Sequence, residues 1–152
     1  MGGYGAGSTK VKGSHYTDTK GFKVSDKNAI EVAEYYIKQG RYVAFLHEGK
    51  HRRADLSVGG RHVEVKGLTT LSPSTIEKHL ENAFQQVDGD RYRYPPKTWR
   101  EGKVVLLSRH DSSVSRITIL DAMRKGFESA QRKGEITGKV EVWIRGKIYK
   151  LN

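Results

Sequence analysis

The sequence has no cysteine, only three prolines and no long apolar run among its 152 residues. Without cysteine there is no disulfide framework, no thiolate zinc site and no thiol nucleophile. No stretch approaches the roughly 18 apolar residues of a membrane-spanning helix, and residues 1–25 lack the apolar core of a signal peptide. We therefore expect no membrane insertion, and we expect any export to be directed by a segment outside these residues.

Positive charge is in clear excess. Lysine and arginine number 28 against 17 aspartate and glutamate residues, which gives a formal net charge of +11. Such a surplus attracts a polyanion through phosphate contacts and counterion release. With 36% hydrophobic and 30% charged residues, the composition is otherwise that of one ordinary globular domain. We expect a nucleic-acid partner, although an acidic protein that inhibits the domain would use the same charge.

The chain divides simply. Residues 1–24 begin with several glycines and are expected to form a flexible lead or linker, so that residues 25–152 form the functional domain. Hydrophobic periodicity and capping residues predict helices that start near residues 25–26, 72–74 and 114–115. Strands are predicted over residues 41–47, on both sides of Gly59-Gly60, over residues 103–108, and over residues 140–144 as an edge strand.

The stretch around Gly59-Gly60 is the most informative part of the chain. Two glycines suit a two-residue hairpin turn, because glycine tolerates the positive φ that such turns require. Counting outward from the turn places Asp55 directly across from Glu64. Side chains alternate between the two faces of a strand. The predicted apolar face holds Ala54, Leu56, Val58, Val63 and Val65, and the polar face holds Arg53, Asp55, Ser57, His62, Glu64 and Lys66.

This pairing predicts a metal site or a salt-bridged surface. Two opposed carboxylates repel each other unless a cation, a proton or a neighbouring base compensates them. Magnesium fits the ligand set, because it prefers oxygen and usually binds only one or two protein carboxylates. Lys66 would then orient or deprotonate a bound water, or offset charge on phosphorus in the transition state. The alternative is a solvated strand face with cross-strand ion pairs, and the spacing is compatible with both.

A family resemblance favours the metal site. Asp55, followed after the glycine turn by Glu64-Val65-Lys66, resembles the D…ExK core of the PD-(D/E)XK nuclease superfamily, whose usual Pro-Asp is here Ala54-Asp55. The resemblance implies an α/β fold with an αβββαβ core, in which helices flank a mixed central sheet. It also implies a metal-dependent endonuclease that hydrolyses phosphodiester bonds. Asp55, Glu64 and the Val65 carbonyl would bind Mg²⁺ or Mn²⁺, and Lys66 would assist the attacking water.

A longer similarity points to a biological role. Gly40-Arg41-Tyr42-Val43 and the segment 74–86 extend the match, so that residues 25–150 resemble nuclease toxin domains at the C-termini of contact-dependent growth inhibition proteins and related bacterial polymorphic toxins. This resemblance implies transfer RNA as the preferred substrate, with DNA as the runner-up, and a cognate immunity protein. It further implies secretion within a larger effector and action in the cytoplasm of a target cell; without such a parent protein, the domain would be cytoplasmic.

Other residues are candidates for completing the site. Glu31 and Glu34 lie on the first helix, where the superfamily often carries a further carboxylate. Thr75, His79, Asn82 and Gln86 form a polar stripe on the second helix, and Gln86 matches a glutamine of the toxin domains; Thr75 and Gln86 are preferred. Residues 90–100 mix cations with aromatic rings, which suits phosphates and unpaired bases or a loop that closes over the core. The candidate nucleic-acid contacts are Arg53, Lys78, Arg91, Arg93 and Lys97.

Two further functions compete with this interpretation. In a metal-independent ribonuclease, His47, His51 or His62 would act as general base and acid, with Lys66 or Arg53 stabilising the oxyanion. A basic nucleic-acid-binding module without turnover is the second alternative. That module would leave the carboxylate pair unexplained, since acids at the centre of a phosphate-binding face weaken binding.

Overall fold

The computed structural model of the chain describes residues 10–11, 15–47, 49, 53–89 and 101–152, and shows a mixed α/β fold. Within these residues a six-stranded sheet has the order β3-β4-β5-β6-β7-β8. Strands β5, β6 and β7 run parallel, and the other neighbours are antiparallel. The helices are α1 (Lys27–Lys38), α2 (Pro73–Gly89) and α3 (Arg116–Arg132), and the strands of the sheet are β3 (Val43–Phe45), β4 (Leu56–Val58), β5 (Arg61–Leu68), β6 (Lys103–Ser108), β7 (Lys139–Ile144) and β8 (Lys147–Lys150).

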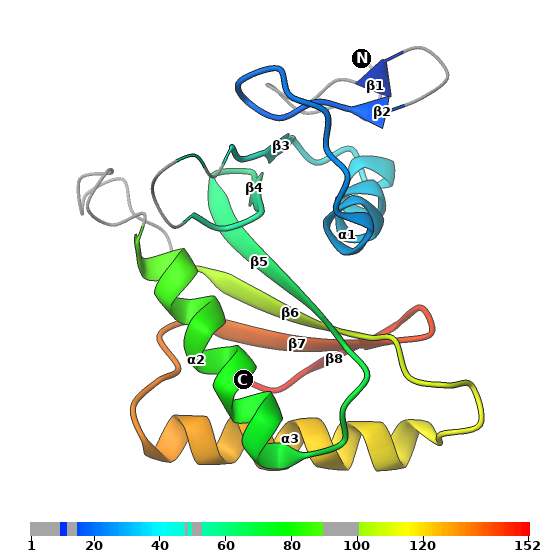
Figure 1. Ribbon diagram of the computed structural model, residues 1–152, viewed down its shortest axis with the longest axis vertical. Helices are drawn as coiled ribbons and strands as arrows, with labels where there is room; N and C mark the ends of the chain where they lie inside the picture. Colours follow the sequence, from blue (N-terminus) through cyan, green and yellow to red (C-terminus); the bar gives the residue numbers. More distant parts are fainter. Residues whose placement is uncertain (1–9, 12–14, 48, 50–52, 90–100) are drawn as a thin grey trace.

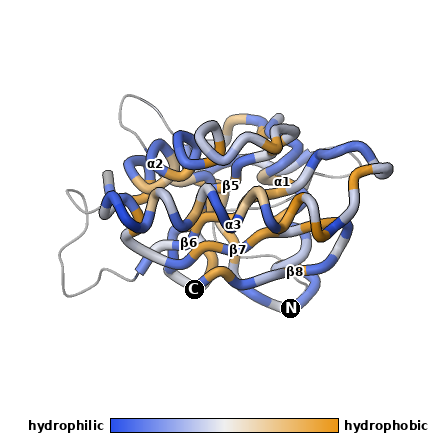
Figure 2. The backbone as a smooth tube through the Cα atoms, turned by 90° about the horizontal axis from the view of Figure 1, so that it is seen from below, coloured by the Kyte–Doolittle hydropathy of each residue, from blue (hydrophilic) through white to orange (hydrophobic). Residues whose placement is uncertain are grey.

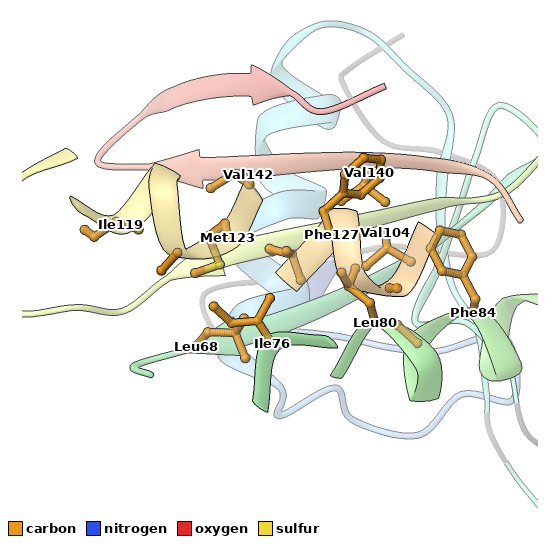
Figure 3. Packing of buried hydrophobic residues seen from close by; sticks show 14 of the residues in the cluster. Leu68, Ile76, Leu80, Phe84, Val104, Ile119, Met123, Phe127, Val140 and Val142 are labelled. Carbon is orange, nitrogen blue, oxygen red and sulfur yellow. The ribbon is translucent and has the colours of Figure 1, made fainter. Parts of the chain in front are cut away.

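The sheet separates two hydrophobic clusters. Helix α1 packs on one face, whereas α2 and α3 cover the other (Figure 1). Figure 3 shows side chains of α2 and α3, among them Leu80, Phe84 and Phe127, packed against Val104 and Val140 of the sheet. Hydrophilic and hydrophobic positions alternate along α3 (Figure 2), as expected for a helix with one buried side. None of the helices formed by the described residues is long and apolar enough to cross a membrane.

Local sequence explains where the helices start and end, as predicted. Asp26 caps α1, because its Oδ1 accepts hydrogen bonds from the backbone N–H groups of Asn28 and Ala29 at 3.0 and 3.2 Å. After α1 the chain turns at Gly40, whose φ of 76° is one that glycine adopts without strain. Ser115 caps α3 in the same way as Asp26 caps α1.

The hairpin register is confirmed, but one residue lies on the other face. Gly59 and Gly60 have φ values of 55° and 87°, and Leu56 pairs with Val63 as predicted. Leu56, Val58, Val63 and Val65 belong to the cluster beneath α1. Ala54 instead belongs to the cluster beneath α2 and α3. Because β4 begins only at Leu56 and the chain bends at Asp55, the alternation of a regular strand does not extend back to Ala54.

Two predicted strands differ in extent or position. Residues 41–47 were expected to form one strand, but β3 comprises only Val43–Phe45. Residues 140–144 were expected at an edge, yet β7 lies between β6 and β8, and β8 forms the edge. Strand β7 is almost wholly buried because α3 and both neighbouring strands cover it, which is the environment of a central strand.

The described part of the expected lead contains a short sheet and one buried side chain. Strands β1 (Lys10–Val11) and β2 (His15–Tyr16) form a two-stranded sheet. Tyr16 is 4% exposed, and its ring lies 5.2 Å from that of Phe45. The expectation of weak core potential before residue 25 is therefore wrong at Tyr16, because a single large aromatic residue fills the edge of the α1 cluster.

The crossing of α2 and α3 gives a stability prediction. A methyl group at Gly126 would lie 2.6 Å from Cγ2 of Ile76 and 2.9 Å from the carbonyl oxygen of Pro73. Alanine in an uncrowded helix is more stable than glycine by ~0.5–1 kcal/mol. Here the collision dominates, so we expect Gly126→Ala to lower the free energy of unfolding by about 1–3 kcal/mol in urea titrations. The neighbouring exposed change Lys125→Ala should have little effect, and an unchanged or raised stability for Gly126→Ala would contradict the tight crossing.

Candidate active site

Asp55 and Glu64 meet across the end of the hairpin, as the sequence predicted. The backbone N–H of Asp55 donates to Oε1 of Glu64 at 3.1 Å, and the N–H of Val65 donates to Oδ2 of Asp55 at 3.0 Å. Glu64 is only 2% exposed. The two carboxylates are thus held by backbone groups of the facing chain segment, in fixed positions and on the same side of the hairpin.

The short length of β4 creates this arrangement. Strand β4 starts at Leu56, whereas β5 continues to Leu68, so that β5 lacks a strand partner on that side beside Asp55. The Val65 N–H therefore bonds to a side chain instead of a strand. In a strand, the N–H and C=O of one residue point to the same neighbour. The Val65 carbonyl accordingly faces the side on which the Asp55 carboxylate lies.

A pocket of about 390 Å³ opens beside the pair. Its lining includes Asp55, Glu64, Lys66 and Gln86, together with Asp26 at the start of α1. Elements that are distant in sequence therefore contribute polar groups to one concave surface. The volume leaves room for water molecules and part of a ligand next to the two carboxylates.

Lys66 is held between the acid pair and α2. Its Nζ lies 3.2 Å from Oε2 of Glu64 and donates to Oε1 of Gln86 at 2.8 Å. Since the Lys66 side chain is 23% exposed, the ammonium is reachable from the pocket. Gln86, proposed from the polar stripe of the second helix, thus orients the lysine that the hairpin places beside Glu64.

Burial makes the acid pair costly to ionise. Burial raises the pKa of Asp55 to about 6, and the charge of Asp26 also acts in the upward direction. Burial and then the neighbouring Asp55 raise the pKa of Glu64 to about 9, although Lys66 opposes the shift. In the absence of another cation, the pair therefore retains a proton at neutral pH. A divalent ion that replaced this proton would relieve the repulsion.

These shifts predict how stability depends on pH. Glu64 has a pKa of about 9 when folded against a reference of 4.5, so between these values the folded state holds a proton that the unfolded state has released. The free energy of unfolding of the metal-free protein should fall as pH rises through this window, by at least ~1.4 kcal/mol, the equivalent of one pKa unit. Urea titrations in EDTA between pH 5 and pH 8.5 would measure the slope. Glu64→Gln should flatten it, and an equal slope in both proteins would refute the assignment to Glu64.

The other carboxylates predicted for the site lie elsewhere. Glu31 forms an exposed ion pair with Arg109 at 2.9 Å. Glu34 accepts a hydrogen bond from the Tyr16 hydroxyl at 3.1 Å. Neither lines the pocket. Thr75 is exposed in the first turn of α2, where its N–H contacts Ser72 Oγ, so only Gln86 of the two preferred stripe residues reaches the site.

The predicted nucleic-acid contacts have mixed positions. Arg53 is 8% exposed, so it is not a surface cation. Lys78 is exposed and pairs with Glu81 at 3.1 Å on the outer side of α2. Arg91, Arg93 and Lys97 lie outside the described residues.

Neither of the two described histidines of the metal-independent mechanism lines the pocket beside the carboxylate pair. His47 Nδ1 lies 2.9 Å from Oδ2 of Asp18, and His62 is 9% exposed within β5. His51 lies outside the described residues. The arrangement of His47 and His62 therefore gives no specific support to the metal-independent mechanism.

Sequence reasoning missed two groups beside the pocket. Asp26 was predicted as a helix cap alone, but it also lines the pocket near Asp55. Phe22 precedes the pocket residue Lys23, is 61% exposed, and stacks on His47 with a ring-centroid distance of 5.2 Å. The Phe22 N–H donates to Oδ1 of Asp18 at 3.0 Å, which fixes this turn. The mixture of aromatic and lysine residues at positions 20–23 is the sequence feature that could have indicated a nucleic-acid contact here.

The donor set of the pocket fits a hard divalent cation. Among the described residues, no group of three or more histidine, aspartate, glutamate or cysteine side chains is arranged to hold a metal ion. Two carboxylates and the Val65 carbonyl nevertheless match the ligand count of magnesium, which keeps several waters and seldom takes more than two carboxylates. Asp55 and Glu64 line one pocket whose volume leaves room for such waters. The site thus suits Mg²⁺ or Mn²⁺ better than zinc, which favours nitrogen and sulfur ligands.

Fold and site together define a mixed α/β protein with a buried acid pair and a lysine beside a truncated hairpin strand. No model of a protein family matches the chain, and neither the curated proteins nor the solved structures give a match.

Proposed function

We propose that this protein is a metal-dependent endonuclease of the PD-(D/E)XK type. The observation that carries the proposal is the buried Asp55/Glu64 pair, with Nζ of Lys66 3.2 Å from Oε2 of Glu64. The pair lies just beyond the end of the β4–β5 pairing. The element order from α1 through β3, β4, β5 and α2 to β6 agrees with the αβββαβ core of that superfamily. The net charge of +11 supports a polyanionic substrate.

The residues of the pocket have separate roles in this proposal. Asp55, Glu64 and the Val65 carbonyl would bind Mg²⁺ or Mn²⁺. The bound ion would supply a water of lowered pKa and neutralise charge on the phosphate oxygens. Lys66, held by Gln86, would direct the water toward phosphorus and stabilise the negative charge that develops there. Burial of the pair keeps these interactions out of bulk solvent, which strengthens them.

Transfer RNA is the proposed substrate, and DNA is the second candidate. The observation that favours RNA is the exposed Phe22 ring, which is stacked on His47 and adjoins Lys23 of the pocket lining. Proteins recognise unpaired bases by stacking them on such rings beside cations, and transfer RNA presents unpaired bases in its loops. A duplex DNA substrate would not offer a base to this ring without strand opening.

The same proposal assigns a role in bacterial antagonism. We expect the domain to be delivered within a larger secreted effector, to act in the cytoplasm of a target cell, and to be neutralised by a cognate immunity protein. The support is the positive surplus, which an acidic inhibitor would complement. Co-expression with the product of the adjacent gene would test this role: it should restore growth to cells in which the active domain, but not Glu64→Gln, arrests growth.

A cleavage assay tests the proposed activity. Purified protein is incubated with total transfer RNA and with plasmid DNA, each in Mg²⁺, in Mn²⁺ and in EDTA. We expect cleavage of transfer RNA in the presence of either ion and none in EDTA. Metal-dependent cutting of DNA alone would change the substrate, EDTA-resistant cutting of RNA would favour the histidine mechanism, and no cutting of either polymer would favour a binding module.

A further inference from the structure

A second, positively charged pocket lies on the α1 face of the sheet. It has a volume of about 270 Å³, and its lining includes Arg61, Lys103, Lys139 and Lys150. Each cation comes from a different strand, from β5 to β8 in order across the sheet. We call this surface the basic pocket. Among the described residues of its lining, Glu141 has the only acidic side chain.

Strand register forces like charges together in the basic pocket. Lys103 and Lys139 are direct partners in the parallel pair of β6 and β7, and Lys150 is the partner of Glu141 in the next pair. Like charges at paired positions destabilise a sheet unless something compensates them. A bound anion would relieve this repulsion.

The carboxylate of Glu141 is already engaged within the protein. Its Oε1 accepts a hydrogen bond from Nε1 of Trp143 at 3.1 Å, and its Oε2 pairs with Nζ of Lys103 at 3.1 Å. Lys103 also donates to the Tyr36 hydroxyl at 3.1 Å, and its side chain is only 13% exposed. This buried network pairs the Glu141 carboxylate with only one of the four cations.

Two of the other cations, Lys139 and Arg61, can still bind an anion. The Nζ atom of Lys139 lies 3.8 Å from Oε1 of Glu101. Both side chains are about half exposed, so this ion pair is weak. The Nε atom of Arg61 is buried and has no hydrogen-bond partner within the part of the chain that the structure describes. A buried donor without an acceptor is costly and points to a ligand that accepts hydrogen bonds.

We propose that the basic pocket binds a phosphate group of the nucleic-acid strand, at a position away from the scissile bond. The attribution to nucleic acid rests on the proposed function; the anion chemistry stands on the pocket alone. A phosphate fits because its oxygens can accept hydrogen bonds from a guanidinium and from several ammonium groups at once. Arg61 and Glu64 are three residues apart on β5, about 10 Å along an extended strand, and their side chains point to opposite faces of the sheet. A polynucleotide that contacts both pockets would therefore pass around the sheet and not along one face.

The test uses charge-matched variants. Lys139→Gln with Lys150→Gln removes two exposed cations of the basic pocket, and Arg124→Gln with Lys125→Gln removes two exposed cations of α3. Binding of a fluorescent single-stranded oligoribonucleotide is measured by anisotropy over a series of salt concentrations, with Glu64→Gln included in every protein to prevent cleavage. Arg61→Gln is a third variant, and circular dichroism confirms that each protein is folded.

We expect the Lys139/Lys150 variant to bind about tenfold more weakly than its parent, with a salt slope reduced by about 1.4, the value for two lost contacts with a single strand. Arg61→Gln should weaken binding in the same direction, and the α3 variant should stay close to its parent. Equal effects of the two double variants would overturn the proposal, because the loss would then reflect total charge.

Inorganic pyrophosphate distinguishes the source of the phosphate. We expect it to raise the melting temperature of the parent protein and of the α3 variant, but not that of the Lys139/Lys150 variant. Stabilisation by pyrophosphate through these lysines, with unchanged oligonucleotide binding, would refute the nucleic-acid assignment. Cleavage by the unmodified protein is measured separately. If the protein cleaves but the Lys139/Lys150 substitutions do not weaken oligonucleotide binding, only the phosphate site in the basic pocket is refuted. If binding depends on these lysines but no cleavage occurs, only the proposed function is refuted.

Discussion

Glu64→Gln is expected to abolish metal-dependent cleavage, with a rate loss of about a thousandfold or more. The change removes one of the two proposed carboxylate ligands while keeping nearly the same volume in a position that is 2% exposed. Loss of ~4 kcal/mol of charge stabilisation at the phosphate corresponds to this factor. Single-turnover cleavage of the preferred substrate in Mg²⁺ measures it directly.

The same variant should separate activity from folding. Because Glu64 is buried beside Asp55 and has a raised pKa, a neutral amide should leave the metal-free protein as stable as before or more stable. Glu31→Gln is the matched control, since Glu31 forms an exposed ion pair with Arg109 and does not line the pocket. It should keep full activity. Full activity in Glu64→Gln, or inactivity that accompanies unfolding, would remove Glu64 from the proposed mechanism.

Lys66→Gln is expected to lower kcat by about 10²–10⁴-fold, the range typical of a positioned proton-transfer group. Lys66 contacts both Glu64 and Gln86, and its side chain reaches the pocket. In the proposed mechanism the lysine acts on the water and on developing charge and not on ground-state binding, so KM should change little. Metal binding at pH 8, measured by calorimetry, should persist, since both carboxylates and the Val65 carbonyl remain.

Two further variants sharpen the test of Lys66. Gln86→Leu removes the acceptor at 2.8 Å that orients the ammonium, so it should lower kcat less than Lys66→Gln does. Lys78→Gln removes an exposed cation that pairs with Glu81, and any effect should fall on KM instead of kcat. A loss that appears only in KM for Lys66→Gln would make this residue a substrate contact without a role in the chemical step.

Local features of the sequence predicted much of the candidate site. The glycine turn sets the register of the hairpin, and strand alternation then places Asp55 and Glu64 together. Helical spacing placed Gln86 on the stripe that reaches Lys66. These inferences succeeded because each depends on residues that are close in sequence and on a fixed repeat of the backbone.

The features that were missed depend on tertiary packing. The switch of Ala54 to the other core follows from where β4 begins, which the residues around Ala54 do not reveal. The central position of β7 depends on strand order across the parallel crossovers, and the alternation within one strand contains no such information. Tyr16 and Asp26 acquire their roles from β3 and Asp55, which are far from them along the chain.

The most direct test of the cation site is a calorimetric titration of Mn²⁺ into the metal-free protein at pH 7, in two buffers that differ in ionisation enthalpy. Metal binding to a protonated acid pair must release the proton that the pair holds. With pKa values of about 6 for Asp55 and about 9 for Glu64, we predict one bound ion and release of close to one proton. Neither should occur in Glu64→Gln. An absence of binding, or binding with the same proton release in Glu64→Gln, would contradict a metal site at this pair.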